Sequence, residues 1–362
     1  MKIVPGRNLV FIAAGLAVLG GLSYWFWAAP FHPQGQKSGP LEKITLGVDH
    51  SGLNALIWIA HQRFDTANGL DMVVKTYPSG RDALKDLEAG RLDFACCADF
   101  VLVKEIMTGQ TNLRCLSALA SGEIDELIAR RDRGISRPED LRGKTIGVPR
   151  TTSAEFFLGG FLTLNHLALN EVSVIDINPF DLADNLAAGK VDAVLVWEPV
   201  TYEIVKKIGG NAVIWPAQVG QDVYWLLVAQ EGYLKSKPLV AEKLLRALLQ
   251  AADFMKKRPG EGWRIIAERM RVPLADLQAG KYLKKFELFL DQSLLLAMED
   301  EARWLIRNRQ TTENKMPNFL HYFRVEPLAT VEPKAVRTII PKAESNMAPG
   351  PAGGEGSIPG MK

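Results

Sequence analysis

The chain has 362 residues, of which 47% are hydrophobic and 23% charged, and its formal net charge is +2. This length is sufficient for two domains, and the composition is that of ordinary globular proteins. The charge gives no electrostatic reason to expect nucleic acid, and no basic run is interleaved with aromatic residues, so we exclude nucleic-acid binding. Cys96, Cys97 and Cys115 lie in apolar stretches, which favours buried free thiols over disulfides or metal ligands.

The amino-terminal part resembles a membrane anchor. An uninterrupted apolar segment, 9–29, follows a basic end, 1–8. The segment is long enough to span a bilayer as a helix of about 20 residues. We expect a retained transmembrane signal anchor, with residues 1–8 in the cytoplasm and the rest on the periplasmic or extracellular face; a cleaved signal peptide and a soluble periplasmic protein are the alternative. Residues 30–41, rich in Pro, Gly and Ser, are expected to form a linker.

A first α/β lobe is expected after the linker. Strands are predicted at 44–48, 71–77, 92–97, 113–119 and 126–130, with helices at 54–64, 81–89 and 99–108. Regular alternation of strand and helix implies mostly parallel pairing, right-handed crossovers and helices on both faces of the sheet.

A second α/β lobe follows. Helices are predicted at 135–141, 153–166, 181–188 and 202–208, and strands at 145–148, 172–177, 191–196 and 212–215. A further strand, 222–229, is expected to return to the first lobe. The chain therefore crosses between lobes near Arg131 and near Asp222, and two extended crossings make a hinge.

The last part of the chain has a helical pattern. Apolar residues at three- and four-residue spacing predict helices at 238–257, 259–270, 273–282 and 291–308. We expect lobe 1 to comprise 42–130 and 226–327, and lobe 2 to comprise 131–225. Residues 328–362, rich in Pro, Gly, Ala and Ser, are expected to be a disordered tail.

The stretch KTIGVPRTTSAEFFL, 144–158, places hydroxyls where a strand runs into a helix. Thr152 and Glu155 have the spacing of a capping box, which predicts a helix start near Ser153. The free amides at that helix start, with the hydroxyls of Thr151, Thr152 and Ser153, are suited to a small polar or anionic ligand. The alternative is that these hydroxyls only cap the helix.

The order strand, turn of small residues, helix occurs twice in the chain. KITLGV is followed by Asp49, His50, Ser51, Gly52 and an apolar helix, and LKDLEAGRLDFACC matches LADNLAAGKVDAVLV. Two similar α/β lobes that face each other leave a cleft between them. The sequence thus predicts a ligand site in an interlobe cleft.

Four motifs that follow one another in the chain resemble those of a known family: RFDTANGLDMVV, PSGRDALKDLEAGRLDF, DLRGKTIGVPRTTSAEFFL and AAGKVDAVLVWEPV. Over about 42–325 the chain resembles the periplasmic substrate-binding proteins of ABC importers in the nitrate, sulfonate, taurine and pyrimidine-precursor branch. The resemblance implies a two-lobed type II periplasmic-binding fold that closes around a small molecule and delivers it to an ABC permease and its ATPase. We expect a monomeric globular part and no cofactor.

The resemblance also implies a set of ligand contacts. Carried over by position, they are Ser51, Gly52, Ala98, Asp99, Thr151, Thr152, Ser153, Trp197 and Glu198. Beside the return crossing, either Tyr224 or Trp225 is expected to face the cleft, and we include Tyr224. Trp197 could stack on a ligand or pack in the core, and Glu198 could receive an ammonium or pair with a lysine. The chain departs from the family pattern at Arg150, where a glycine is common; turned inward, this residue would favour an anionic group.

Two other functions stay open at this stage. The chain lacks the P-loop, G-x-S-x-G, H-E-x-x-H, C-x-x-C and G-x-G-x-x-G motifs, and its histidines show no metal spacing, so a pyrimidine-synthase-like enzyme is disfavoured. A membrane-tethered module that reports its ligand to a receptor is the second alternative to delivery.

Overall fold

The computed structural model describes residues 40–218, 220–279 and 284–338. Within these ranges no helix combines the length and apolar character that a membrane span requires. The predicted anchor, 9–29, lies outside the described residues, as do the predicted cytoplasmic end, 1–8, and most of the linker.

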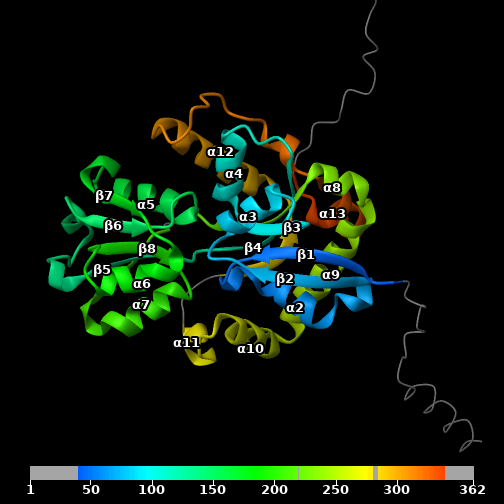
Figure 1. Cartoon of the computed structure of the whole chain (residues 1–362), viewed down its shortest axis with the longest axis horizontal. Helices are drawn as coiled ribbons and strands as arrows, with labels where there is room; N and C mark the ends of the chain where they lie inside the picture. Colours follow the sequence, from blue (N-terminus) through cyan, green and yellow to red (C-terminus); the bar gives the residue numbers. More distant parts are fainter. Residues whose placement is uncertain (1–39, 219, 280–283, 339–362) are drawn as a thin grey trace, which may run out of the picture. The chain divides into compact units, whose positions relative to one another are not determined.

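The first sheet forms one lobe with the carboxyl-terminal helices. Its strands, in spatial order, are β11 (Lys284–Phe289), β4 (Leu113–Gly122), β10 (Val223–Gln230), β3 (Phe94–Ala98), β1 (Glu42–Val48) and β2 (Leu70–Thr76). Its helices are α2 (Ala55–Arg63), α3 (Gly80–Glu88), α4 (Asp99–Met107), α8 (Glu231–Ser236), α9 (Pro238–Lys257), α10 (Pro259–Met270), α12 (Gln292–Arg307) and α13 (Val325–Val331). They surround the sheet (Figure 1).

The second sheet forms the other lobe. Its strands, in spatial order, are β7 (Ser173–Asp176), β6 (Thr145–Val148), β8 (Ala193–Trp197), β5 (Asp125–Arg130) and β9 (Ala212–Pro216). Its helices are α5 (Ser153–Leu164), α6 (Pro179–Ala187) and α7 (Val200–Ile208). A short helix, α11 (Leu274–Ala279), follows α10 and lies below this lobe in Figure 1.

Both sheets are mixed, so the prediction of mostly parallel sheets is wrong. β1 pairs in parallel with β2 and β3, and β6 pairs in parallel with β7 and β8. β10 runs antiparallel to β3 and β4, β11 runs antiparallel to β4, and β5 runs antiparallel to β8 and β9. β10 enters the first sheet from the second lobe, and β5 enters the second sheet from the first lobe. Each runs antiparallel to both of its neighbours, so the parallel pairing that strand–helix alternation predicts holds only among β1, β2 and β3 and among β6, β7 and β8.

The first crossing between the lobes lies earlier than predicted. β4 belongs to the first sheet and β5 to the second, so the chain crosses at 123–124 and not near Arg131. It returns between β9 and β10, near Asp222 as predicted. Gln218, only 2% exposed, joins the two crossings, because its Oε1 accepts hydrogen bonds from the amides of Ile124 (2.6 Å) and Asp125 (2.8 Å).

The helices α9 and α10 begin and end at the predicted residues, whereas β11 lies between two predicted helices, 273–282 and 291–308, where no strand is predicted. In β11 the half-buried Phe286 and the buried Leu288 alternate with polar residues, the period of a strand with one buried face. Ordered structure also reaches into the first residues of the predicted tail, because α13 ends at Val331 and a 3-10 turn follows. Residues 339–362 lie outside the described ranges.

The predicted internal repeat has a counterpart in hydrogen bonding. Asp93, before β3, accepts a hydrogen bond from the amide of Thr45 on β1 (2.7 Å). Asp192, before β8, accepts one from the amide of Thr145 on β6 (2.9 Å). Each aspartate thus ties the beginning of its own strand to a neighbouring parallel strand, to the middle of β1 in the first lobe and to the start of β6 in the second.

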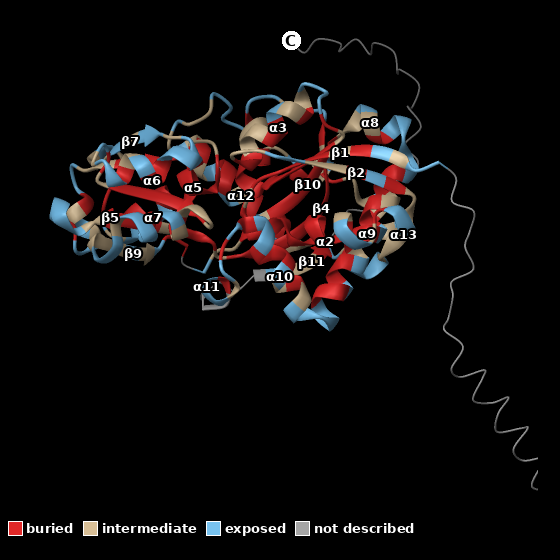
Figure 2. Cartoon of the chain, turned by 60° about the horizontal axis from the view of Figure 1, so that its bottom comes forward, coloured by how far each residue is buried: buried red, intermediate tan, exposed pale blue. Residues whose placement is uncertain are grey.

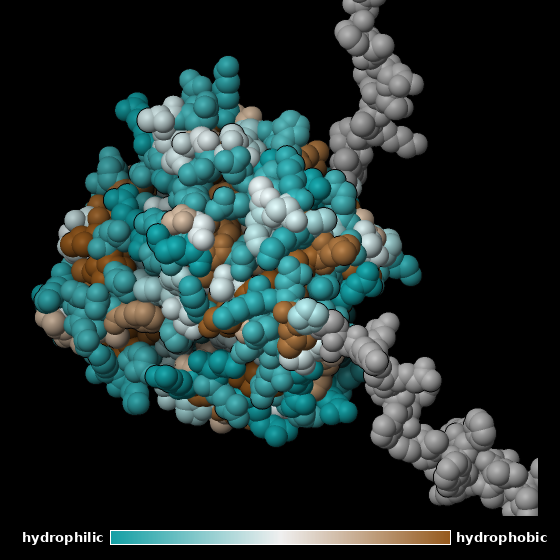
Figure 3. Space-filling model, turned by 45° about the vertical axis from the view of Figure 1, so that its right-hand side comes forward, coloured by the Kyte–Doolittle hydropathy of each residue, from teal (hydrophilic) through white to brown (hydrophobic). Residues whose placement is uncertain are grey.

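The cores lie along the strands, while the outward faces of the helices are exposed (Figure 2). Every residue of β3 and β8 is buried, and the face of the molecule in Figure 3 is mainly hydrophilic with small hydrophobic patches. The lobes also touch through three rings: Phe156 of α5 packs against Phe100 of α4 and Trp304 of α12, with ring centroids 5.5 and 5.7 Å apart. Gly159 permits this approach, because a Cβ there would lie 2.5 Å from Trp304 Nε1.

Candidate functional site

A small cavity lies between the two sheets; we call it the inner cavity. Its walls come from both lobes and comprise Asp49, Gly80, Ala98, Val101, Ile124, Thr152, Ser153, Trp197 and Trp225. Its volume is about 10 Å³, which is room for one water molecule at most. A solute of any size therefore enters only when the lobes part or side chains move.

The ends of strands bring these residues together. Asp49 directly follows β1, Ala98 ends β3, and Trp197 ends β8. Ser153 is the first residue of α5, which follows β6. The carboxyl ends of parallel strands, and the amino-terminal ends of the helices that follow, are where open α/β sheets bind ligands.

The start of α5 is where it was predicted, but the capping box does not form. The Thr152 hydroxyl donates to the carbonyl of Pro149 (2.5 Å) and caps no first-turn amide. Glu155 reaches back one residue further than a capping box requires, accepting from the amide of Thr151 (2.8 Å) and from Arg150 Nε (2.8 Å). The reason is the left-handed turn at Thr151, with φ of 62°, which brings that amide to the carboxylate.

Asp49 is held in place by a chain of hydrogen bonds. Its Oδ1 accepts from the amide of Ser51 (2.8 Å) and from Asn54 Nδ2 (2.7 Å), and Asn54 Oδ1 accepts from Trp225 Nε1 (2.8 Å). Asp49 is 1% exposed. Burial raises the pKa of Asp49 to about 6, and these hydrogen bonds lower it only in part.

Asp125 is a second buried carboxylate, on the opposite lobe. Burial and the negative charge of Asp49 raise its pKa to about 7, while the nearby Ser153 hydroxyl lowers it in part. Asp125 is paired with Trp197 in the β5–β8 register, so both side chains lie on the same face of the sheet. Neither carboxylate oxygen of Asp125 has a hydrogen bond of ordinary geometry to the described residues.

A larger cavity of about 240 Å³, the outer cavity, shares the wall formed by Trp197. His50 and Phe180 meet edge to face across it, with ring centroids 5.5 Å apart, and Arg271 closes it from the end of α10. Burial and the charge of Arg271 lower the pKa of His50. The remaining wall residues are Pro78, Pro179, Ala183, Pro199, Val200 and Glu203.

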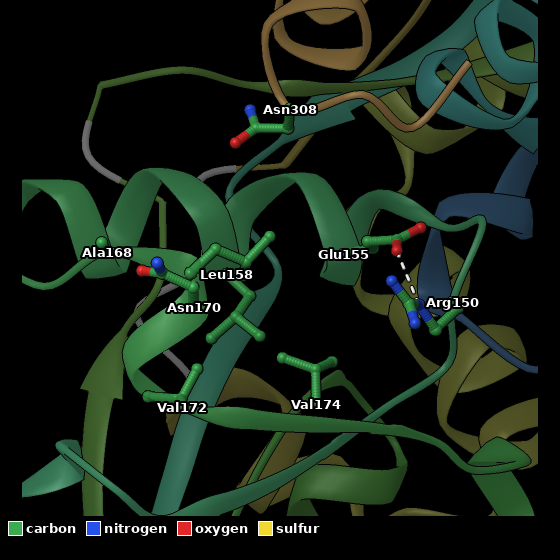
Figure 4. Close-up of a pocket in the computed structure, with 9 residues that line it drawn as sticks. Arg150, Glu155, Leu158, Ala168, Asn170, Val172, Val174 and Asn308 are labelled. Carbon is green, nitrogen blue, oxygen red and sulfur yellow. Dashed lines mark hydrogen bonds and ion pairs between the residues drawn. The ribbon is translucent and has the colours of Figure 1, made fainter. Parts of the chain in front are cut away.

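A separate groove of about 500 Å³ runs along α5 and β7 (Figure 4). Arg150 lines this groove and is paired with Glu155, with 2.8 Å between Nε and Oε1. Leu158, Val172 and Val174 form its apolar floor. Arg150 is therefore not among the residues of the inner cavity, where an inward arginine would have favoured an anion.

The structure brings together part of the predicted contact set. Ala98, Thr152, Ser153 and Trp197 line the inner cavity. Ser51 and Gly52 lie beside Asp49 in the turn after β1 and are buried, but they form no part of the wall. Thr151, Glu198 and Tyr224 are also absent from it.

Asp99 and Tyr224 serve a different cluster. Asp99 Oδ1 accepts from the amide of Tyr224 (3.3 Å), and Asp99 is next to Glu301 of α12. Burial raises the pKa of both carboxyls, to about 7 for Asp99 and well above the usual range for Glu301. Asp99 and Glu301 thus form a pair of buried acidic groups within the first lobe, apart from the wall of the inner cavity.

Several wall residues were missing from the predicted contact set. Besides Asp49 and Trp225, they are Gly80, Val101 and Ile124. A local signal existed for Asp49, a carboxylate directly after a buried strand, and for Trp225, the neighbour of Tyr224 on a strand whose successive side chains alternate in direction.

All three cysteines are buried and free, as predicted. Burial raises the pKa of each thiol, for Cys115 to about 12. A thiol with a raised pKa is a poor nucleophile and a poor metal ligand, so the cysteines act as core residues.

Comparisons with known proteins fit this architecture. A family model described as "NMT1/THI5 like" matches residues 60–262. A Brucella abortus (strain 2308) protein named "Putative binding protein" is 26% identical over 231 residues, which is 61% of this chain and 70% of that protein.

Two solved structures have similar folds. The alkanesulfonate-binding protein SsuA from Xanthomonas axonopodis pv. citri, bound to MOPS, aligns with a TM-score of 0.65 and 16% identity over 83% of this chain and 99% of its own. The desulfurization enzyme DSZB aligns with a TM-score of 0.58 and 17% identity over 81% of this chain and 99% of its own. Binding proteins and an enzyme thus share the fold.

Proposed function

The chain belongs to the NMT1/THI5-like family, as the four sequence motifs predicted, and we propose that it is an extracytoplasmic solute-binding protein that delivers a small polar molecule to an ABC importer. Its fold is the two-lobed α/β type II periplasmic-binding fold. The observation that carries the proposal is the inner cavity, whose walls come from both lobes and contain nearly fully buried polar side chains.

The geometry supports binding by closure. Arg81 of α3 donates from Nη1 to the carbonyl of Arg150 in the turn before α5 (2.7 Å) and lies 3.5 Å from Asp176 Oδ1 of β7, so this side chain joins the lobes at this edge of the cleft. The two crossings, joined by Gln218, form the hinge about which the lobes rotate. Closure removes water from the solute, which strengthens each polar contact with it.

Binding fits the inner cavity better than catalysis does. Its wall of described residues contains hydroxyls, a carboxylate and two indole rings, but no histidine, lysine or cysteine. The Oδ1 of that carboxylate, Asp49, accepts from the Ser51 amide and from Asn54 Nδ2, not from the hydroxyls of Thr152 or Ser153. The proposed partners are an ABC permease and its ATPase. The proposed site of action is the periplasmic face of the membrane, with residues 9–29 as the anchor.

Thermal-shift screening with small sulfonates, nitrate, amines and pyrimidines tests the proposal, because a solute that binds only the folded state raises its melting temperature. Trp197→Ala should abolish the shift. Thr163→Ala is the control, because the Thr163 hydroxyl lies on the same helix α5 as Ser153 but donates to the carbonyl of Gly159 (2.9 Å), away from the inner cavity. An equal shift in wild type and Trp197→Ala would contradict the proposed site.

A further inference from the structure

Two buried carboxylates from opposite lobes lie at or beside the inner cavity. Asp49 lines it from the first lobe, and Asp125 lies on the same face of the second sheet as the cavity-lining Trp197. The exposed fractions of Asp49 and Asp125 are 1% and 2%. They are close enough for the charge of Asp49 to act on Asp125. When both groups are ionised, the solute therefore meets negative charge from both lobes.

The oxygens of Asp125 are poorly satisfied. Both are buried without a hydrogen bond of ordinary geometry to the described residues, and the nearby Ser153 hydroxyl lowers the pKa of this carboxyl only in part. Buried polar groups are rarely left in this condition, because an unpaired buried charge is costly. The partner that the site needs is a hydrogen-bond donor, and a donor with positive charge suits it best.

Positive side chains do not balance this charge. The wall of the inner cavity, as far as the structure describes it, contains no arginine, lysine or histidine. The guanidinium of Arg81 is bonded to the carbonyl of Arg150, and that of Arg150 is paired with Glu155. A sulfonate or nitrate in this cavity would add negative charge beside two carboxylates and bring no donor to them.

The two indole rings complete the site. Trp197 and Trp225 line the inner cavity, and both are at most 5% exposed. Trp225 Nε1 already donates to Asn54 (2.8 Å), so this side chain offers the solute its ring and not its donor. The face of an indole attracts cations, and the attraction is greatest where water is excluded.

We infer that the solute is a small protonated amine whose ammonium N–H groups donate to Asp125 and Asp49 while its carbon atoms contact Trp197 and Trp225. The outer cavity, of about 240 Å³ and sharing Trp197, takes the rest of the molecule. This inference rests on the proposed function and narrows its ligand class from polar solutes to cations. A quaternary ammonium fits less well, because it has no N–H to donate.

Isothermal titration calorimetry of the full chain in detergent at pH 8 tests the inference. The probes are ethanolamine, putrescine and butylamine, their quaternary analogue tetramethylammonium, the anions butanesulfonate and nitrate, and neutral cytosine. We expect a primary amine to bind and the anions not to bind. Asp125→Asn, which keeps the shape but removes the charge, should weaken amine binding at least ten-fold.

The matched control is Asp132→Asn, because Asp132 is an exposed aspartate of the same lobe, 2.7 Å from Arg130 Nη2. It should leave amine affinity unchanged. Binding of an anion or of cytosine with no amine binding would overturn the inference and leave the proposed function standing. Amine binding that is equal in wild type and Asp125→Asn would overturn the inference as well. If no probe of any class binds, both the inference and the proposed function fail.

Discussion

The most informative single change is Asp125→Asn, measured as stability against pH without solute. The pKa of Asp125 is about 7 in the folded protein and 3.8 in an unfolded chain, a difference of about 3 units. A raised folded pKa means that the stabilisation from this group is fully present below pH 3.8 and is lost as pH rises through 7. At 1.36 kcal/mol per unit, wild type loses at most about 4 kcal/mol over that range.

Asparagine cannot ionise, so Asp125→Asn does not suffer this loss. The difference in unfolding free energy, variant minus wild type, should grow between pH 4.5 and pH 8, by up to about 3 kcal/mol. Urea denaturation followed by circular dichroism at several pH values measures it. In the control Asp132→Asn the sign is opposite, because Arg130 lowers the pKa of Asp132 and its contribution is lost as pH falls. If the unfolding free energies of Asp125→Asn and wild type differ by the same amount at every pH, Asp125 is not a buried carboxylate with a raised pKa, and the reasoning is refuted.

Two further predictions concern the walls of the cleft. Gly80→Ala should lower stability by about 1–3 kcal/mol in thermal unfolding, because its Cβ would lie 2.7 Å from the Cα of Cys97, a backbone atom that cannot move aside. Gly160→Ala, on an open face of α5, should be neutral or stabilising. Arg81→Gln should weaken solute binding by about 1.5–3 kcal/mol, because it removes the charge-assisted hydrogen bond to Arg150 that joins the lobes; unchanged affinity in calorimetry would contradict this role.

Local sequence patterns were sufficient to predict the positions of most helices and strands. Gly90 and Gly189, both with φ near 70°, end helices just before buried strands, and the sequence marks both places. Strand direction was not predictable in this way, because pairing between β10 and β3 joins residues far apart in the chain and leaves no local pattern. The same holds for β11, whose partner β4 lies far back in the sequence.

The candidate site was predictable only where one segment determines it. Ser153 stands at a strand–helix junction that the sequence displays, and it lines the inner cavity. Asp49 and Asp125 come close only because the two lobes meet, so their mutual effect on pKa has no sequence signal. Arg150 is a residue that the sequence offers for the cleft but that lies elsewhere. Its guanidinium pairs with Glu155, five residues later, in the groove along α5 and β7.

The position of a bound solute tests the central claim most directly. A crystal structure of the protein with the solute found by screening should show it between Asp49 and Asp125, in contact with the ring of Trp197. A solute seated instead in the groove beside Leu158, with the space between the lobes unchanged, would contradict binding in the interlobe cleft.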